Sequence, residues 1–388
     1  MACVICAGER VEELCSHRPS ISTDRRVLDV ATRTLVCLAC GSAWNEGGAR
    51  SQELDFYAEH YDLHGESAAS EWQVYVEGDR RGENDAILEF VEANAALAPA
   101  GRLLEVGCGK GVLLGKFLRA HPGWSAAGVE PSRNAVAYFA EVLPGVRIHE
   151  GPFETAPFRD ERFDFVGSSG VLEHVPDPAA FLRGLRGCLQ PGARCYVGVP
   201  NFRAKPDDLL LFDHLVHFTP DALDVIYARV GLRLIARSAT DDRVWLWDLV
   251  EATEPATPAP AAQVVERGLA LARAHRDAVT DGLETFERFL GELGEGETGA
   301  LFGLGVLGVL ALERAGARAA RVRYALDDNP HLWGQRKGAL EVQGSEAVRR
   351  LGIDRAFLSA NPCYHERMAR KLEGQGLDPA RIYRWGGA

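Results

Sequence analysis

The residues with the clearest chemical potential lie in a glycine-rich segment in the first third of the chain. Residues 103–111 have the sequence LLEVGCGKG, in which an acidic residue precedes three glycines. Glycines let the backbone turn sharply and approach a ligand closely, and the N–H groups of a following helix would face the same space. The segment therefore predicts a ligand cradle between a strand and a helix. Its candidate ligand-binding residues are Glu105, Gly107, Cys108, Gly109 and Gly111.

The spacing of these glycines, Gly-x-Gly-x-Gly, differs from the Gly-x-Gly-x-x-Gly fingerprint of dinucleotide-binding folds. An acidic residue followed by glycines at this spacing resembles the first motif of the class I S-adenosylmethionine (SAM)-dependent methyltransferases. Three later segments resemble further parts of that family in the same order, and the four together extend from about residue 102 to residue 201. The resemblance implies a Rossmann-like α/β domain that binds SAM.

The resemblance gives these segments roles in holding SAM. Glu130 ends the second expected strand, where a carboxylate can accept hydrogen bonds from both ribose hydroxyls; a charge that only favours the next helix N-terminus is the alternative. Phe153 and Glu154 follow the third strand, where the family contacts the adenine. Residues 163–178 resemble the fourth strand and its loop, in which His174 is either structural or a proton acceptor. The predicted SAM-binding set is completed by Pro131 and Ser169.

Four cysteines near the N-terminus form two Cys-x-x-Cys pairs. Cys3 and Cys6 make the first pair, and Cys37 and Cys40 make the second. Four thiolates suit a tetrahedral Zn²⁺ ion, and a site with four protein ligands is closed and structural. A short segment with few apolar residues to form a core also needs the stabilisation that a bound metal gives. We therefore predict a structural zinc site.

The zinc prediction leaves two alternatives open. The gap between the cysteine pairs is longer than in the usual zinc ribbon, so Cys15 or His17, which lie inside it, could replace one ligand. A redox Cys-x-x-Cys is the second alternative, although such motifs normally lie between a strand and a helix of a thioredoxin-like unit.

A segment beyond the expected SAM-binding region is similar to a narrower family. Residues 212–218, FDHLVHF, resemble the Glu-His-Leu-x-x-Phe segment of the zinc-containing C-methyltransferases of deoxysugar biosynthesis, which act on nucleotide-linked 4-keto sugars. The resemblance implies that His214 removes the proton next to the ketone, since a histidine pKa lies near working pH. Asp213 would assist by positioning or by proton handling. Ordinary loop residues are the alternative for His214 and His217.

The predicted function is therefore methyl transfer from SAM to a carbon next to a ketone, through an enolate, on a nucleotide-linked sugar or a related small molecule. Methylation of oxygen or nitrogen on a sugar or natural product is the second interpretation. A non-catalytic module that binds zinc and SAM is a further one. The departures of the sequence from the narrower family concern the substrate more than the type of reaction.

The tail of the chain contains a glycine turn of its own. Gly303, Gly305 and Gly308 follow an expected strand and open a helix, and Asp327 or Asp328 ends the next strand roughly 20 residues later, which matches the dinucleotide fingerprint. One interpretation is an NAD site in a bifunctional protein. The other is that the glycines serve packing, in a unit that could hold the nucleotide or phosphate part of a substrate.

Alternating strands and helices must position these residues, and they indicate a doubly wound, mostly parallel sheet. A helical stretch is expected before it, over about residues 67–98. The expected strands are 102–106, 125–130, 146–149, 163–168, 194–199, 232–238 and 244–250, and the expected helices 112–120, 133–142, 178–189 and 220–230.

Shifts in composition divide the chain into four expected parts. A segment rich in Pro, Ala and Thr separates the SAM-binding region from a long helical stretch, and a second, smaller Rossmann-like unit follows. The expected parts are a zinc-binding segment at 1–61, a methyltransferase domain with its preceding helices at 62–250, a linker and helical segment at 251–299, and a C-terminal α/β domain at 300–388.

Composition and charge limit the classes of partner. A net charge of −12 disfavours non-specific nucleic-acid binding, which needs Lys and Arg to replace phosphate counterions. We find no apolar run long enough to span a bilayer and no basic-then-apolar signal sequence at the N-terminus. We expect a cytoplasmic enzyme with a small-molecule substrate; the oligomeric state stays open.

Overall fold

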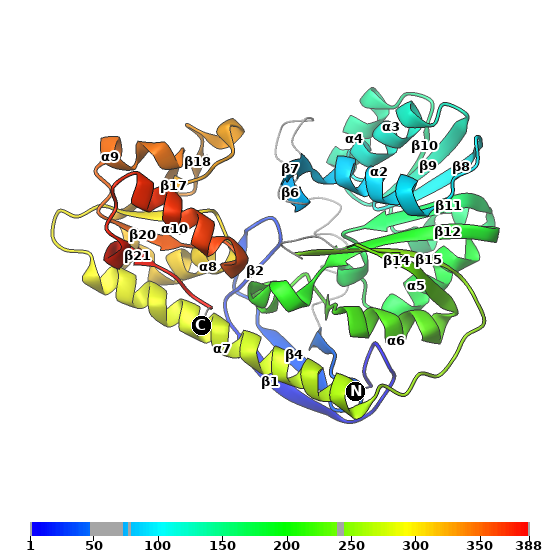
Figure 1. Ribbon diagram of the computed structural model, residues 1–388, viewed down its shortest axis with the longest axis horizontal. Coiled ribbons are helices and arrows are strands. Elements are labelled where there is room, and N and C mark those ends of the chain that lie inside the picture. The colour runs from blue at the N-terminus through cyan, green and yellow to red at the C-terminus, as the bar shows by residue number, and fades with distance from the viewer. Residues whose placement is uncertain (1, 47–72, 77–78, 239–243, 387–388) are drawn as a thin grey trace. The chain divides into compact units, whose positions relative to one another are not determined.

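The computed structural model describes residues 2–46, 73–76, 79–238 and 244–386. The chain forms two compact units (Figure 1). The first comprises residues 1–13, 35–203 and 213–269, and the second comprises residues 14–34, 204–212 and 270–388. Among the described residues, no helix combines the length and the apolar character that crossing a membrane would require.

A seven-stranded sheet is the centre of the first unit. Its order is β10-β9-β8-β11-β12-β15-β14. The five strands from β10 to β12 are parallel, and β15 and β14 are antiparallel to their neighbours. The predicted doubly wound, mostly parallel sheet is confirmed. The strands are β8 (Gly101–Val106), β9 (Trp124–Glu130), β10 (Arg147–Glu150), β11 (Phe163–Ser169), β12 (Leu189–Pro200), β14 (Leu232–Arg237) and β15 (Trp245–Ala252).

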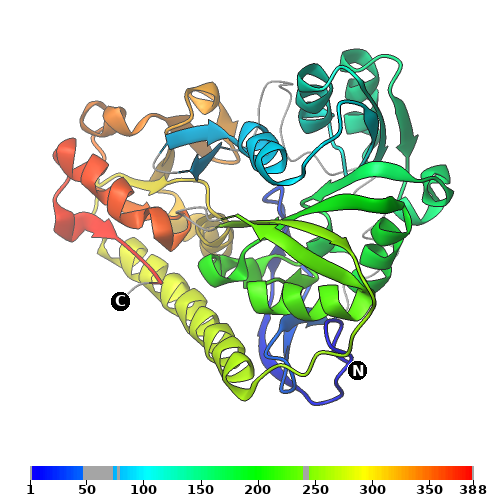
Figure 2. The same ribbon diagram turned by 45° about the vertical axis from the view of Figure 1, so that its right-hand side comes forward.

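Successive side chains of the central strands enter two different cores, as the period of two in a strand requires. Leu103 and Phe165 pack in one core with residues of α2, α3 and α4. Leu104 and Val166 pack in the other with residues of α5 and α6. Figure 2 shows these helices on the two faces of the sheet. The helices are α2 (Glu83–Asn94), α3 (Val112–Ala120), α4 (Arg133–Val142), α5 (Pro178–Gly187) and α6 (Pro220–Val230).

Local sequence explains where these helices begin. The side chains of Ser132, Asp177 and Thr219 each accept a hydrogen bond from a backbone N–H in the first turn of the helix that follows. Pro178 and Pro220 occupy the first helical position, where a missing N–H costs nothing. Helices α3, α4 and α6 therefore have the bounds that the sequence predicted.

The predicted helix over residues 67–98 is wrong in its central part. Strands β6 (Gln73–Val76) and β7 (Asp79–Gly82) pair antiparallel, and α2 begins only at Glu83. Residues 67–72 lie outside the described residues. Val74, Tyr75 and Val76 are β-branched or aromatic, and such residues favour strands. The helical spacing of apolar residues further along the chain concealed this local preference.

A small strand pair joins the N-terminal region of the first unit to a distant loop. β5 (Ala43–Glu46) pairs antiparallel with β13 (Val216–His217), with Val216 opposite Trp44 and His217 opposite Ala43. β5 belongs to a four-stranded sheet of order β1-β4-β5-β13. The other strands of the N-terminal region are β1 (Val11–His17), β2 (Ser20–Ile21), β3 (Val27–Leu28) and β4 (Thr32–Cys37).

The second unit contains a six-stranded sheet of order β18-β19-β17-β16-β20-β21. All neighbours are parallel except the edge pair β18 and β19. The long helix α7 (Ala262–Glu292) leads into it. The remaining elements are β16 (Gly299–Phe302), α8 (Val306–Ala315), β17 (Val322–Leu326), β18 (Arg336–Lys337), β19 (Leu340–Gln343), α9 (Val348–Leu351), β20 (Arg355–Leu358), α10 (His365–Gly374) and β21 (Ile382–Tyr383).

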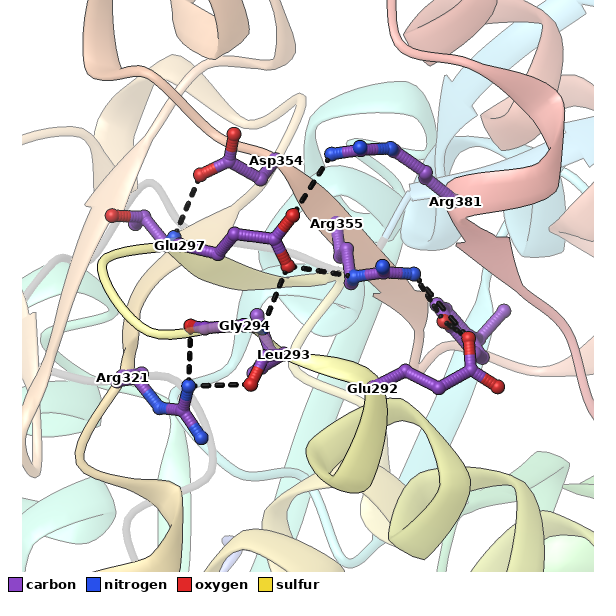
Figure 3. A network of polar contacts seen from close by, with 10 residues as sticks. Glu292, Leu293, Gly294, Glu297, Arg321, Asp354, Arg355 and Arg381 are labelled. Carbon is purple, nitrogen blue, oxygen red and sulfur yellow. Dashed lines mark hydrogen bonds and ion pairs between the residues drawn. The ribbon is translucent and has the colours of Figure 1, made fainter.

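A polar network closes the turn between α7 and β16. The Glu297 carboxylate accepts hydrogen bonds from Arg355 Nε at 2.9 Å, from Arg381 Nη1 at 3.1 Å and from the Gly294 N–H at 2.8 Å (Figure 3). The hydrogen bond from Gly294, followed by that from Arg355, lowers the pKa of Glu297. Asp354 accepts a further hydrogen bond from the Thr298 N–H at 2.8 Å. The network ties this turn to the start of β20.

The glycine turn of the tail packs tightly against β20. A Cβ on Gly305 would lie 1.7 Å from the carbonyl oxygen of Ser359, and one on Gly308 would lie 2.2 Å from the Ser359 Cβ. The Gly305 N–H donates to Ser359 Oγ at 3.0 Å, and that hydroxyl donates to the Gly303 carbonyl at 2.7 Å. Contact with Ser359 therefore accounts for the glycines at positions 305 and 308.

We predict that Gly305→Ala destabilises the protein by at least about 3 kcal/mol, because the added methyl overlaps a backbone atom that cannot move aside. Gly291→Ala is the matched control. It lies in α7, where no atom of the part of the chain that the structure describes comes within 4 Å of the added methyl, and should gain about 0.5–1 kcal/mol. Urea unfolding measures both changes. A Gly305→Ala protein as stable as wild type would contradict the close packing.

Candidate functional site

The glycine turn after β8 is tight on one side and open on the other. A Cβ on Gly107 (φ +76°) would lie 2.1 Å from Val171 Cγ2, so only glycine fits there. Gly109 (φ +51°) has no atom of the described residues within 4 Å of its Cβ position. Gly111 (φ +77°) is the N-cap of α3. The turn therefore leaves open space above the carboxyl end of β8, beside β11, where the strand order reverses and ligands of such sheets bind.

Glu130 is fixed against this turn by two backbone hydrogen bonds. Its Oε2 accepts from the Gly109 N–H and its Oε1 from the Ser132 N–H, each at 2.9 Å. The side chain is buried, and burial raises its pKa although both hydrogen bonds oppose the shift. Each carboxylate oxygen keeps a further lone pair. The structure thus brings Glu130 and Gly109 together, in an arrangement that two ribose hydroxyls would fit.

Glu105 is buried behind the turn at the end of β8. Burial, and then the charge of Glu130, raise its pKa from an ordinary 4.5 to about 8. Its Oε2 has no hydrogen-bond partner among the described residues. Leu103, Phe165 and Tyr196 line the same small cavity. SAM is a cation, and a nearby cation favours the ionised form of a carboxyl group; a buried carboxyl group beside an open cradle therefore fits SAM.

Three other predicted SAM-binding residues lie at or near the ends of β8, β9 and β11. Ser169 ends β11, with its Oγ 3.4 Å from Tyr196 Oη, and Pro131 follows Glu130 directly. Cys108 is buried, and its Sγ lies 2.7 Å from the Cβ position of Gly128, so its side chain packs on β9.

The two residues predicted to contact the adenine follow β10. Phe153 is buried in the core, with its ring centroid 5.6 Å from that of Phe181 and against Gly184 of α5. Its ring already has packing partners there. Glu154 is exposed. Contact of either residue with an adenine stays a prediction.

Two histidines that are distant in the sequence meet in the first unit. The rings of His174 and His214 lie 4.8 Å apart at 80°, and ligand atoms of these two and of Glu173 all lie within 4.8 Å of one another. His174 Nδ1 is 2.7 Å from the carbonyl oxygen of Asp213. Because a carbonyl only accepts, Nδ1 carries the proton and Nε2 is the basic nitrogen of a neutral His174. All four residues are buried or nearly so.

The histidine pair belongs to the same edge of the sheet as the glycine turn. His174 lies in the loop after β11, and Val171 of that loop contacts Gly107. The Gly170 N–H donates to the carbonyl of Gly198 at 3.0 Å, which holds the loop on β12. A basic imidazole therefore lies in the loop that covers the predicted SAM cradle.

The sequence interpretation missed Glu173, and it did not foresee the contact between His174 and His214. The only available signal was that both histidines follow expected strands of one sheet. The carboxyl ends of parallel strands meet at one edge, which makes such contacts possible without specifying them.

The four predicted metal ligands lie together. Cys3 Sγ is 3.7 Å from Cys40 Sγ, and Cys6 Sγ is 3.6 Å from Cys37 Sγ. Four sulfurs at the usual Zn–S distance in a tetrahedron are about 3.8 Å apart. The N–H groups of Ile5, Gly8 and Ala39 each approach one of these sulfurs within 3.4 Å, as they would in order to stabilise thiolates. The site fits a zinc ion; Cys15 and His17 are not members of this group.

We predict that Glu105→Gln changes the pH dependence of stability. Because the folded state raises the pKa of Glu105, it favours the protonated form. That stabilisation is complete below pH 4.5 and is lost as the pH rises through about 8. Relative to the variant, the ligand-free wild type should lose up to about 4 kcal/mol between about pH 5 and pH 9. Urea unfolding across this range measures it, with Glu141→Gln, an exposed carboxyl group of α4, as control. Parallel curves for wild type and Glu105→Gln would refute the shift.

Comparison with known proteins identifies this part of the chain. Residues 76–237 match the model of a methyltransferase domain. An uncharacterised 37.1 kDa protein of transposon TN4556 from Streptomyces fradiae is 32% identical over 208 residues, which are 52% of this chain and 58% of that protein. A ubiquinone biosynthesis O-methyltransferase of Xanthomonas axonopodis pv. citri is 34% identical over 122 residues, 30% of this chain and 50% of the enzyme.

The chain thus spans little more than half the length of the curated relatives it matches. Among solved structures, the methyltransferase CcbJ from Streptomyces caelestis aligns with 44% of this chain and 89% of its own, at 20% identity and a TM-score of 0.37. The residues that match the family model contain the glycine turn and Glu130. Residues 76–237 are a class I SAM-dependent methyltransferase domain.

Proposed function

We propose that the protein transfers a methyl group from SAM to a carbon next to a ketone, on a nucleotide-linked sugar or a related small molecule. The observation that carries this proposal is the His174–His214 pair, which lies in and beside the loop that covers the SAM cradle. Carbon acids next to a ketone need a base for the chemical step, and an imidazole is suited to it near neutral pH.

Residues of the first unit would hold SAM and zinc. The backbone of Gly107, Gly109 and Gly111 would surround SAM, with Glu130 on its ribose and Glu105 near its positive charge. Ser169, Pro131 and Cys108, the last through its backbone, complete the proposed contacts, together with Phe153 and Glu154. The four cysteines of the N-terminal pairs would hold zinc as a structural ion. Bound SAM supplies an electrophilic methyl group.

The chain's own residues would do the remaining chemistry. His214 takes the proton next to the ketone, and the electrons of the broken C–H bond move into the enolate. The enolate carbon would then take up the methyl group that bound SAM supplies, and the SAM sulfur would keep the electrons of the broken sulfur–carbon bond. His174 lies against His214 with Nδ1 held by the Asp213 carbonyl, which keeps the pair in one arrangement. Asp213 would thus position His174 through its backbone carbonyl.

One observation favours a second candidate function. The relatives named as ubiquinone biosynthesis O-methyltransferases are 34% and 32% identical to 30% of this chain, and their name describes transfer to oxygen. In that case the histidine pair would remove a hydroxyl proton. An NAD site in the tail is the weakest candidate, because Ser359 Oγ already accepts from the Gly305 N–H that a pyrophosphate would need.

We predict that Glu130→Ala weakens SAM binding by about 1.5–3 kcal/mol, because charge-assisted hydrogen bonds to the ribose are lost. Isothermal titration with SAM measures the change. Glu150→Ala, at the exposed end of the neighbouring strand β10, should bind like wild type. Equal SAM affinity of Glu130→Ala and wild type would exclude the ribose role.

We predict that His214→Gln abolishes deuterium exchange next to the ketone. The wild type, SAM and a nucleotide-linked 4-keto-6-deoxy sugar in D₂O should give exchange and a methyl gain by mass spectrometry. His121→Gln, at the far end of α3, should retain both. Methyl gain without any exchange would support transfer to oxygen or nitrogen, and exchange retained by His214→Gln would refute the assigned base.

A further inference from the structure

We propose that Asn45 is a positioning residue that couples the cysteine site to His214, so that the N-terminal metal module forms part of the active site rather than only stabilising the chain. The proposal rests on the proposed function in one respect, namely that His214 is the base. It concerns residues of the first unit alone.

Asn45 contacts the His214 segment through three separate groups. Its Nδ2 donates to the carbonyl of His214 at 2.8 Å, and its backbone N–H donates to the carbonyl of Leu215 at 2.9 Å. Its Oδ1 lies 3.3 Å from His217 Nε2. The side chain is buried, and β5 pairs with β13 directly beside it. One asparagine thus holds the carbonyls of His214 and Leu215.

The segment that contains Asn45 is anchored at its N-terminal end on the cysteine site. Cys40 Sγ lies 3.3 Å from Ser42 Oγ, and the Cys37 N–H donates to the Ser42 carbonyl at 2.9 Å. β5 begins at the next residue, Ala43. Only two residues therefore separate Asn45 from a serine that touches two of the four cysteines.

The cysteine site is itself held against helix α6 and the first part of helix α7. Arg229 of α6 donates to the carbonyls of Val4 and Ile5. Gly41 and Gly268 of α7 approach so closely that a Cβ on Gly268 would lie 2.5 Å from the Gly41 carbonyl oxygen. A zinc ion that holds the four cysteines together would preserve both of these contacts. Without the metal, the cysteine site would no longer hold the start of β5, and therefore would no longer hold Asn45.

The contacts that position Glu130 and Gly107 in the SAM cradle are separate from β5. Glu130 is held by the N–H groups of Gly109 and Ser132, and Gly107 is packed on Val171. None of these contacts involves β5 or the cysteines. Loss of the Asn45 contacts should therefore affect the base and leave SAM binding intact.

Two variants separate hydrogen bonding from packing. Asn45→Asp keeps the volume and an oxygen facing His217 but replaces the donor to the His214 carbonyl, whereas Asn45→Ala removes the whole amide. Both should lower the rate of ketone-adjacent deuterium exchange at least tenfold while the Kd for SAM stays within twofold of wild type. Asn94→Ala is the matched control, since Asn94 Nδ2 makes the same 2.8 Å bond to a carbonyl, that of Phe90, in α2.

A readout independent of substrate is the nitrogen NMR spectrum of the histidine rings, in which His214 is assigned by its loss in His214→Gln. The His214 signals should shift in both Asn45 variants, and also when a chelator removes zinc or Cys37→Ser lowers its content; added zinc should restore them in the chelated wild type. Asn94→Ala should leave them unchanged.

Two results would overturn the coupling: His214 signals that do not respond to Asn45→Ala and zinc removal, or a wild-type exchange rate in both Asn45 variants. Recovery of exchange and signals in Asn45→Asp alone would reduce the role of Asn45 to packing and also overturn the proposal. Exchange retained by His214→Gln would instead refute the base, and the NMR comparison would still decide whether zinc and Asn45 control the His214 segment.

Discussion

The methyltransferase domain depends on the attachment of one carboxylate to two backbone N–H groups. Glu130 ends β9, and its oxygens accept from Gly109 in the turn after β8 and from Ser132 before α4. The bond to Gly109 ties the ends of two neighbouring strands, and the bond to Ser132 fixes the start of a helix. A buried carboxylate without such donors would be costly. The hydrogen bonds therefore allow a charged group to lie where a ligand with hydroxyl groups can reach it.

Much of this domain could be predicted because its determinants are local. Caps such as Ser132, Asp177 and Thr219, and prolines at the first helical position, define helix starts within a few residues of sequence. Strand residues buried on both faces give the continuous apolar runs that a parallel sheet requires. The same reasoning failed over residues 73–82, where the helical spacing of later apolar residues outweighed the β-branched and aromatic residues of β6.

The histidine pair of the candidate site could be predicted only as separate residues. His174 and His214 lie in different loops, and their contact results from the order of strands in the sheet together with the pairing of β5 with β13. Asn45 carries no sequence signal of its own, because its partners are backbone carbonyls 169 and more residues away. Phe153 is an aromatic residue at the place in the sequence where the family contacts the adenine. Its ring nevertheless packs against α5. Side-chain direction depends on tertiary contacts that spacing does not encode.

The two glycine turns of the chain show why a motif needs its surroundings. Each follows a strand and opens a helix beside the point where strand order reverses. In the first, no described residue approaches the Cβ position of Gly109, and its N–H binds a carboxylate that keeps further lone pairs. In the second, Ser359 fills the space at Gly305 and Gly308 and takes the Gly305 N–H. The sequence of the second turn matches a ligand-binding fingerprint more closely, yet its glycines are used in packing. Occupation of the space beside a turn, rather than glycine spacing, therefore decides whether the turn can bind a ligand.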